Sequence, residues 1–135
     1  MTVLVDSDIL IEVSRGRDQD ILSRWMELSH SRNDILYSPV SAAELWAGAR
    51  PREHQALTNL FAALRCAPVD AATGQQAGDY LRHYRQSHSV ELGDALIAAT
   101  ALVHGLTVVT RNLADFEPMG VKLINPWVAQ SDDKL

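Results

Sequence analysis

The chain has 135 residues and a formal net charge of −5 at pH 7. That length suits one domain with a buried core, and the 47% hydrophobic and 21% charged residues are typical of a globular protein. The negative charge excludes a protein that coats nucleic acid indiscriminately, and no apolar run reaches the ~18 residues that a membrane span needs.

Two further features of the composition limit the class of protein. No basic leader precedes the first apolar run, and Cys66 is the only cysteine, which excludes an internal disulfide and a multi-cysteine zinc site. We therefore expect a cytoplasmic protein. Ten of the twelve cationic residues are arginine, which suits phosphate recognition but also results from a GC-rich genome.

Short apolar runs alternate with longer helical patterns along the whole chain. The predicted strands are 3–5, 35–37, 67–69, 106–109 and 121–124. The predicted helices run from Asp6 to near Gly16, from Asp18 or Asp20 through Met26, from Ser41 to Gly48, from Pro51 through Leu64, from Asp70 through Tyr84 and from Val90 to His104, with a helical turn over 112–116. This alternation predicts an α/β fold in which a parallel sheet of about five strands lies between two helical layers.

The central helix is predicted from its unusual composition. After Asp94 the segment holds only apolar and small residues for a full helix length, so we expect it to be buried on nearly every side. It ends at Gly105, before a short apolar strand. We find no internal repeat or linker, which predicts a single domain over 1–135 with a polar tail at about 128–135.

Four carboxylates fall at one edge of the predicted sheet. Asp6 ends the first strand, Glu44 lies early in the helix after the second, Asp94 begins the central helix, and Asp115 follows the fourth strand. Ligands of parallel sheets bind beyond the carboxyl ends of the strands, where helix N-termini also point. The four side chains are therefore candidates for one site.

Each carboxylate also has a purely structural interpretation as a helix cap. Ser41 to Glu44 has the spacing of a capping box, and Asn112 to Asp115 resembles one with Asp in place of Glu. Caps explain each residue singly but do not explain why four helices bring acids to one edge.

Carboxylates held within a few ångströms raise one another's pKa unless a cation lies among them. Oxygen ligands without cysteine or paired histidine favour Mg²⁺ or Mn²⁺. Such an ion polarises a phosphoryl group and generates hydroxide from bound water, as phosphodiester hydrolysis requires. The pattern predicts a metal-dependent nuclease.

The motifs resemble those of PIN-domain ribonucleases, and specifically the VapC-like toxins of bacterial toxin–antitoxin pairs. The resemblance covers nearly the whole chain and is carried by four segments: V-L-V-D-S-D-I-L-I at 3–11, S-A-A-E-L at 41–45, G-D-A-L-I-A-A-T-A at 93–101 and T-R-N-L-A-D-F at 110–116. It implies a PIN-like fold, endoribonuclease activity, a homodimer, and a VapB-like antitoxin whose tail blocks the site.

The resemblance also implies roles for individual residues. Asp6, Glu44, Asp94 and Asp115 would form the acidic quartet that binds one or two Mg²⁺ or Mn²⁺ ions. Thr110 and Asn112 would support the site, with Arg111 between them as an RNA or antitoxin contact. Asp8 stands where the family often has an uncharged polar residue, so we do not expect it to be a ligand, and we interpret Glu91 as a solvated surface acid.

Two alternatives from other classes stay open. Asp6-Ser7-Asp8 after an apolar strand resembles the first motif of haloacid-dehalogenase-like phosphatases, with Asp6 as nucleophile, although Leu10 departs from that motif. The second alternative is a non-catalytic α/β binding module in which the acids are only caps. The sequence does not identify the RNA target or the antitoxin.

Overall fold

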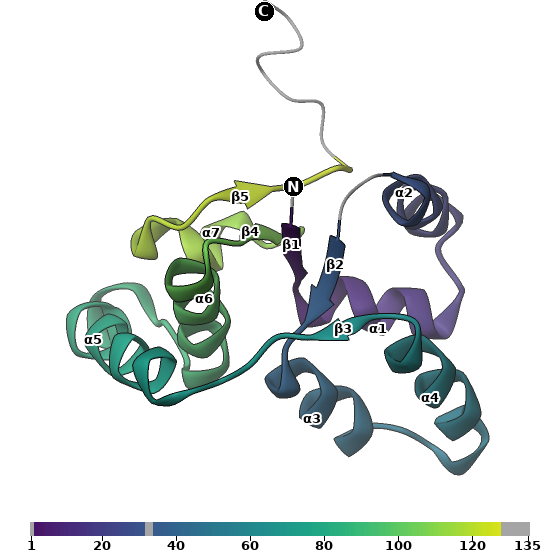
Figure 1. The fold of residues 1–135 in the computed structure, drawn as a ribbon, viewed down its shortest axis with the longest axis horizontal. Helices are drawn as coiled ribbons and strands as arrows, with labels where there is room; N and C mark the ends of the chain where they lie inside the picture. Colours follow the sequence, from purple (N-terminus) through teal and green to yellow (C-terminus); the bar gives the residue numbers. More distant parts are fainter. Residues whose placement is uncertain (1, 32–33, 128–135) are drawn as a thin grey trace, which may run out of the picture.

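The computed structural model describes residues 2–31 and 34–127, and it contains one five-stranded parallel sheet with helices on both faces (Figure 1). The strands are β1 Thr2–Val5, β2 Asp34–Tyr37, β3 Arg65–Cys66, β4 Thr107–Val109 and β5 Leu123–Ile124. Their order in the sheet is β3-β2-β1-β4-β5, so β1 lies at the centre. The predicted three-layer α/β/α fold is confirmed; the predicted tail at about 128–135 lies outside the described residues.

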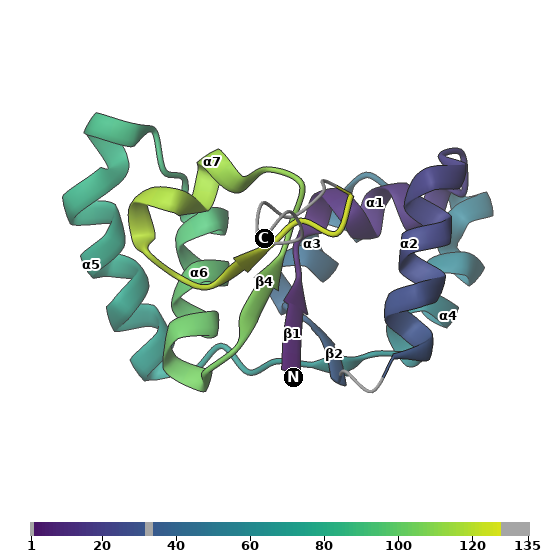
Figure 2. The same ribbon diagram turned by 90° about the horizontal axis from the view of Figure 1, so that it is seen from above.

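Seven α-helices and two short 3₁₀ turns connect the strands in the described part of the chain. They are α1 Ser7–Arg15, α2 Gln19–His30, α3 Pro39–Ala47, η1 Pro51–Glu53, α4 His54–Ala62, α5 Ala71–His88, α6 Leu92–His104, α7 Leu113–Phe116 and η2 Glu117–Met119. Figure 2 shows α5, α6 and α7 on one side of the sheet and α1 to α4 on the other. Within the described residues, none of these helices has the length and apolar character that crossing a membrane requires.

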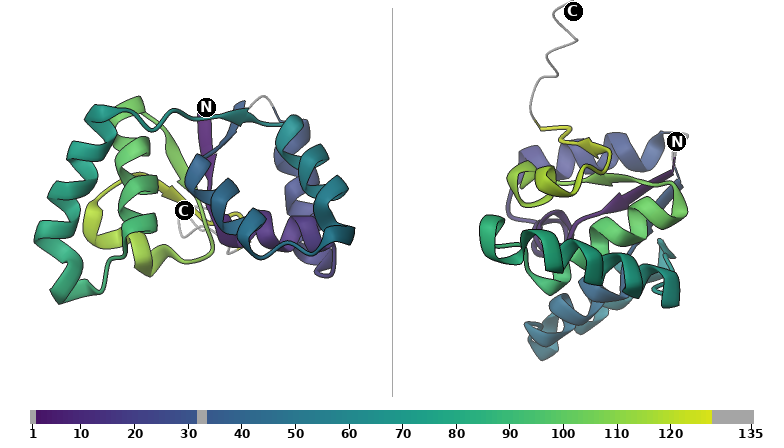
Figure 3. Two further views of the ribbon diagram at one scale, coloured as in Figure 1. Left: turned by 90° about the horizontal axis from the view of Figure 1, so that it is seen from below. Right: turned by 90° about the vertical axis from the view of Figure 1, so that its left-hand side faces the viewer.

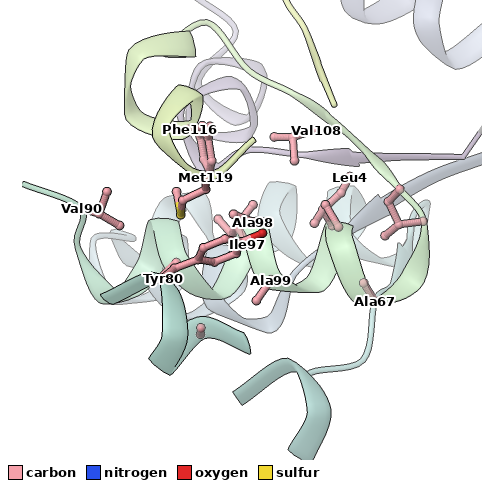
Figure 4. Close-up of a cluster of buried hydrophobic side chains, with 14 of the residues drawn as sticks. Leu4, Ala67, Tyr80, Val90, Ile97, Ala98, Ala99, Val108, Phe116 and Met119 are labelled. Atoms are coloured by element: carbon pink, nitrogen blue, oxygen red, sulfur yellow. The ribbon is translucent and has the colours of Figure 1, made fainter. Parts of the chain in front are cut away.

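The alternation of side chains along β1 divides the core into two. Leu4 packs against α5 and α6, together with Val108 of β4 and the fully buried Phe116 of α7 (Figure 4). Val3 and Val5 point the other way, into a second cluster that includes Trp25. A central parallel strand is apolar at every position because both of its faces are covered.

Helix α6 is buried where the sequence predicts, but not along its whole length. Ala95 and Ala98 are fully buried against the sheet and α5, where small side chains let the helices approach closely (Figure 4). Leu92, Leu102 and Val103 are instead exposed by 58%, 52% and 39%. The prediction of burial on nearly every side is therefore wrong for the two ends of the helix. Met26 of α2 is likewise 53% exposed.

The third strand begins two residues earlier than predicted, at Arg65 rather than Ala67. Tyr37 of β2 pairs with Cys66, and the Ala67 amide donates the last hydrogen bond to the Tyr37 carbonyl at 2.8 Å. Pro68 has no amide hydrogen and cannot extend the ladder. The apolar pattern placed this edge strand at 67–69, two to three residues too late, so the predicted range shares no residue with β3.

Phe116 gives a direct test of how α7 is held against the core. Phe116→Ala removes a fully buried ring and should lower the free energy of unfolding by about 3–5 kcal/mol in chemical denaturation. Leu102→Ala, on an exposed position of α6, is the control and should change it by about 0.5 kcal/mol or less. A loss below about 1 kcal/mol for Phe116→Ala would contradict the packing of α7 described above.

Candidate active site at the carboxyl edge of the sheet

The site lies at the carboxyl ends of the two central strands, β1 and β4. After β1 the chain continues to one face of the sheet, and after β4 it continues to the other (Figure 2). Asp6 follows β1 directly and Thr110 follows β4 directly, and these two strands are neighbours. The Asp6 amide donates to the Val109 carbonyl at 2.9 Å, which extends the ladder by one residue. The Thr110 hydroxyl donates to Asp6 Oδ2 at 2.8 Å. Neighbouring parallel strands whose connections run to opposite faces of the sheet form a topological switch point, and a crevice lies there at the carboxyl ends of the strands.

Asp6 is a buried carboxyl with only 6% of its surface exposed. Its Oδ1 accepts a 2.8 Å hydrogen bond from the Ser7 amide and so caps α1. Burial, followed by the negative charge of Asp8, raises the pKa of Asp6 to about 7, against the opposing effect of the Thr110 and Ser7 hydrogen bonds. At neutral pH the side chain is therefore poised between its charged and neutral forms.

Asp8 belongs to the same site, although the sequence analysis gave it no role. Its Oδ1 accepts from the Ile9 amide at 2.8 Å, and its Oδ2 accepts from Asn112 Nδ2 at 3.2 Å. Burial raises the pKa of Asp8, while its hydrogen bonds and the charge of Arg111 lower it. The negative charge of Asp8 disfavours the charged form of Asp6, so the two carboxyls belong to one electrostatic group.

Two serines connect Glu44 to this pair of aspartates. Ser7 Oγ lies 2.8 Å from Glu44 Oε1 and 2.7 Å from Ser41 Oγ. Because a hydroxyl carries one proton and a carboxylate only accepts, Ser7 donates to Glu44 and Ser41 supplies the proton of the second hydrogen bond. Ser7 and Ser41 are buried, so this contact ties α1 to α3 and orients the otherwise exposed Glu44. Ser7 was not predicted as a site residue, because its only signal in the sequence is its position between two aspartates.

Asp94 and Asp115 form a second acidic group at the same edge. Asp94 is half-buried in the first turn of α6 and accepts a hydrogen bond from the Glu91 amide. Burial raises its pKa to about 6, and the charges of Asp115, Glu91 and Glu44 add to the shift. Asp115, on α7, is exposed, and so is Glu91, as predicted. Asp94 is thus close enough to Asp115 and Glu44 for their charges to act on it.

Neither proposed capping box is formed, which corrects one alternative of the sequence analysis. Helix α3 begins at Pro39 with Ser38 as its cap, so Ser41 lies inside the helix and Glu44 in its second turn. The Asn112 side chain makes no capping bond to α7 and reaches Asp8 instead, while the Asn112 amide is bound by Thr110 Oγ1 at 2.9 Å. The capping role therefore does not account for Glu44 or Asp115.

The acids approach one another without forming a closed cage. As the side chains stand, no three Asp, Glu, His or Cys residues within 2–31 and 34–127 are close enough to hold a metal ion together. The donor chemistry nevertheless fits a hard divalent cation, because Asp6 and Asp94 have pKa values raised by burial and by the charges of neighbouring acids. Asp115 is exposed and has the freedom to move toward an ion, whereas Glu44 is oriented by Ser7.

Comparison with known proteins agrees with this geometry. The PIN domain family model matches residues 3–119. This chain belongs to the PIN domain family. It is 39% identical to ribonuclease VapC10 of Mycobacterium tuberculosis over 93% of this chain and 92% of that protein. It is 30% identical to toxin FitB of Neisseria gonorrhoeae over 93% of this chain and 98% of that protein.

The fold of this PIN domain is also found among solved structures. The crystal structure of VapBC2 from Rickettsia felis bound to a promoter DNA fragment superposes with a TM-score of 0.78 at 21% identity, covering 93% of this chain and 98% of that chain. Several other structures with this fold are toxin–antitoxin complexes. The resemblance to VapC-like PIN domains is thus confirmed.

The pKa values of the site predict how the stability of the metal-free PIN domain depends on pH. Asp6 and Asp94 have folded-state pKa values of about 7 and about 6, above their ordinary value of 3.8. The folded state therefore binds more protons than the unfolded state between about pH 4 and pH 7, and the melting temperature in EDTA should fall as pH rises through this window.

Asp94→Asn should remove part of that slope and raise the melting temperature in EDTA at pH 7, because it deletes one repelling charge and keeps the shape of the side chain. Asp20→Asn is the matched control, since Asp20 is an exposed acid in the first turn of α2. A lower melting temperature for Asp94→Asn together with an unchanged pH slope would identify Asp94 as an ordinary helix-end carboxylate.

Proposed function

We propose that this PIN domain is a Mg²⁺- or Mn²⁺-dependent endoribonuclease and the toxin of a toxin–antitoxin pair. The proposal rests on one observation: carboxylates from separate segments of the chain lie at one edge of the sheet. Among them, Asp6 and Asp94 have pKa values raised by burial and by the charges of acidic neighbours. Family membership and the ribonuclease among its relatives support nuclease chemistry.

Asp6, Glu44, Asp94 and Asp115 would hold the metal. When bound there, the ion would polarise the scissile phosphate and lower the pKa of an attacking water. Hydrogen bonds orient two of these ligands and the neighbouring Asp8: Thr110 holds Asp6, Ser7 holds Glu44, and Asn112 holds Asp8. Hydrogen bonds of this kind hold a carboxylate in one rotamer and so make its geometry suitable for a metal before the metal arrives.

The two alternatives from the sequence analysis now have less support. Membership of the PIN domain family favours phosphodiester hydrolysis over a phosphatase in which Asp6 is a nucleophile. Asp6 also has both carboxyl oxygens engaged, by the Ser7 amide and the Thr110 hydroxyl. A binding module with structural acids gives no reason for the raised pKa values, and it requires no metal.

Purified protein freed of any partner should cleave RNA with Mg²⁺ or Mn²⁺ and stop when EDTA is added. Asp6→Asn and Asp94→Asn should each lower the cleavage rate by at least about 100-fold, because each deletes an expected ligand. The gel-based assay includes Asp20→Asn as a control that should retain the parental rate. Cleavage that continues unchanged in EDTA would contradict the metal mechanism.

The toxin role has a separate test in living bacteria. Induced alone, the chain should arrest growth, and Asp6→Asn or Asp94→Asn should remove the arrest at equal protein levels. FitB, a relative at 30% identity, is named a toxin, and structures with this fold include toxin–antitoxin complexes, so we expect a VapB-like partner to restore growth. Arrest that survives both substitutions would mean that its cause lies outside this site.

Arg111 is proposed as an RNA or antitoxin contact, because it is exposed beside Asp8 between Thr110 and Asn112. Arg111→Ala should weaken RNA or antitoxin binding and leave the melting temperature within about 2 °C of the parent, since surface substitutions cost little stability. Binding is measured by fluorescence anisotropy. A large drop in melting temperature would instead assign Arg111 a structural role.

The homodimer implied by the resemblance is checked by light scattering.

A further inference from the structure

A cleft lined by arginines lies next to the acidic site. Its cationic members, which we call the arginine cleft, are Arg15, Arg17, Arg50 and Arg52. Arg15 ends α1, and Gly16 turns the chain with a φ of 65° so that Arg17 follows on the same side. Arg50 and Arg52 come from the connection between α3 and α4, which Figure 3 shows beside the end of α1. The cavity measures about 560 Å³.

The charge of this cleft is opposite to that of the chain as a whole. Four guanidinium groups line it in a protein of net charge −5, and Glu53 is the one carboxylate among its lining residues. Arg17 pairs with Glu12 at 3.6 Å, whereas no ion pair joins Arg15, Arg50 or Arg52 to a carboxylate of the described residues. Three exposed guanidinium groups are thus available to an anionic ligand.

The arginine cleft lies at the opposite end of α1 from Asp6 and Ser7. A smaller neighbouring cavity shares Ser14, Arg15, Gly48 and Glu53 with it and reaches Glu44. Glu44 is held by Ser7 beside Asp6, as described above. Glu44 thus lies between the acidic edge and the arginine cleft, and an RNA strand that leaves the edge past Glu44 would run toward the cleft.

We propose that the arginine cleft binds backbone phosphates of the RNA strand next to the bond that is cut. The acidic edge itself repels RNA, so affinity must come from an adjoining cationic surface. Guanidinium groups bind phosphate oxygens in a bidentate manner, which also fixes the register of the strand. This inference rests on the proposed ribonuclease function and extends it to how the substrate is held.

The lining of the cleft favours RNA over a segment of a partner protein. Its other members include Ser14, Gly48 and Ala56, and none is a large apolar residue. Protein segments that bind tightly bury aromatic or aliphatic anchors, and the nearest large apolar residues, Ile11, Leu45 and Leu57, line only the smaller neighbouring cavity of about 60 Å³. A nucleic acid backbone needs only the charges and hydrogen-bond donors that the cleft supplies.

The test measures binding without cleavage. Fluorescence anisotropy in EDTA follows a fluorescein-labelled single-stranded RNA of mixed sequence over a series of salt concentrations. Arg50→Gln with Arg52→Gln should weaken binding about tenfold and reduce the slope of log K against log salt by about 1.4, or about 0.7 for each lost phosphate contact. If the first pair of substitutions lowers the melting temperature, Arg15→Gln with Arg17→Gln on the other wall of the cleft takes its place. This second pair should weaken RNA binding to the same extent.

The matched control is Arg82→Gln with Arg85→Gln, which removes the same charge from exposed positions on α5. It should change the affinity by less than about twofold. Equal losses for the cleft and control pairs would overturn the proposal in favour of non-specific attraction. Unchanged RNA binding by both cleft pairs would overturn it as well, and a selective loss of binding to an oligoglutamate peptide would then assign the cleft to an acidic protein segment.

The outcome is separable from that of the proposed function. If the parent protein cleaves RNA and both variants with paired cleft substitutions bind RNA normally, the nuclease function stands and the proposal for the cleft is wrong. If the parent protein fails to cleave RNA, but the variants with cleft substitutions bind RNA more weakly than the control variant, the cleft stands as an RNA-binding surface and the nuclease mechanism is wrong.

Discussion

The hydrogen bond from Thr110 to Asp6 is the contact on which the site depends. It spans 2.8 Å and joins two residues that are 104 positions apart in sequence, each directly after a central strand. The bond forms only when β1 and β4 are paired, so the completed sheet is what aims the Asp6 carboxylate. Buried polar groups need such partners, and here the partner also fixes where the carboxylate points. Folding and the assembly of the site are therefore the same event at this position.

Burial explains why these acids differ from the rest of the surface. Asp6 is almost completely buried and Asp94 half-buried, and desolvation is the largest cause of the raised pKa in both. A protein gains no stability by placing carboxylates where their charged forms are disfavoured. Such positions are retained for chemistry more often than for packing, and a divalent cation would reverse the electrostatic cost by favouring the charged forms.

The sequence predicted the architecture because its signals are local. Alternating apolar runs and helical patterns identified five strands and their parallel arrangement, since each pattern reports which side of an element is buried. The errors arose where tertiary pairing decides. Pro68 and the Tyr37–Cys66 pair fix β3, and Ser38 rather than Ser41 caps α3. Ser7 and Asp8 gained roles from partners far along the chain, Glu44 and Asn112, which no local pattern contains.

The acidic site and the arginine cleft act on an RNA strand in opposite ways. The carboxylates around Asp94 repel phosphate until a cation neutralises them, whereas the arginine cleft attracts phosphate at all times. Glu44 stands at the boundary, since it contributes its charge to the acidic side and lines the cavity that leads to Arg15. In the function proposed above, the strand would be held by the cleft first, and entry of the scissile phosphate among the carboxylates would wait for metal. This order separates binding from cutting, because affinity and reactivity come from different residues.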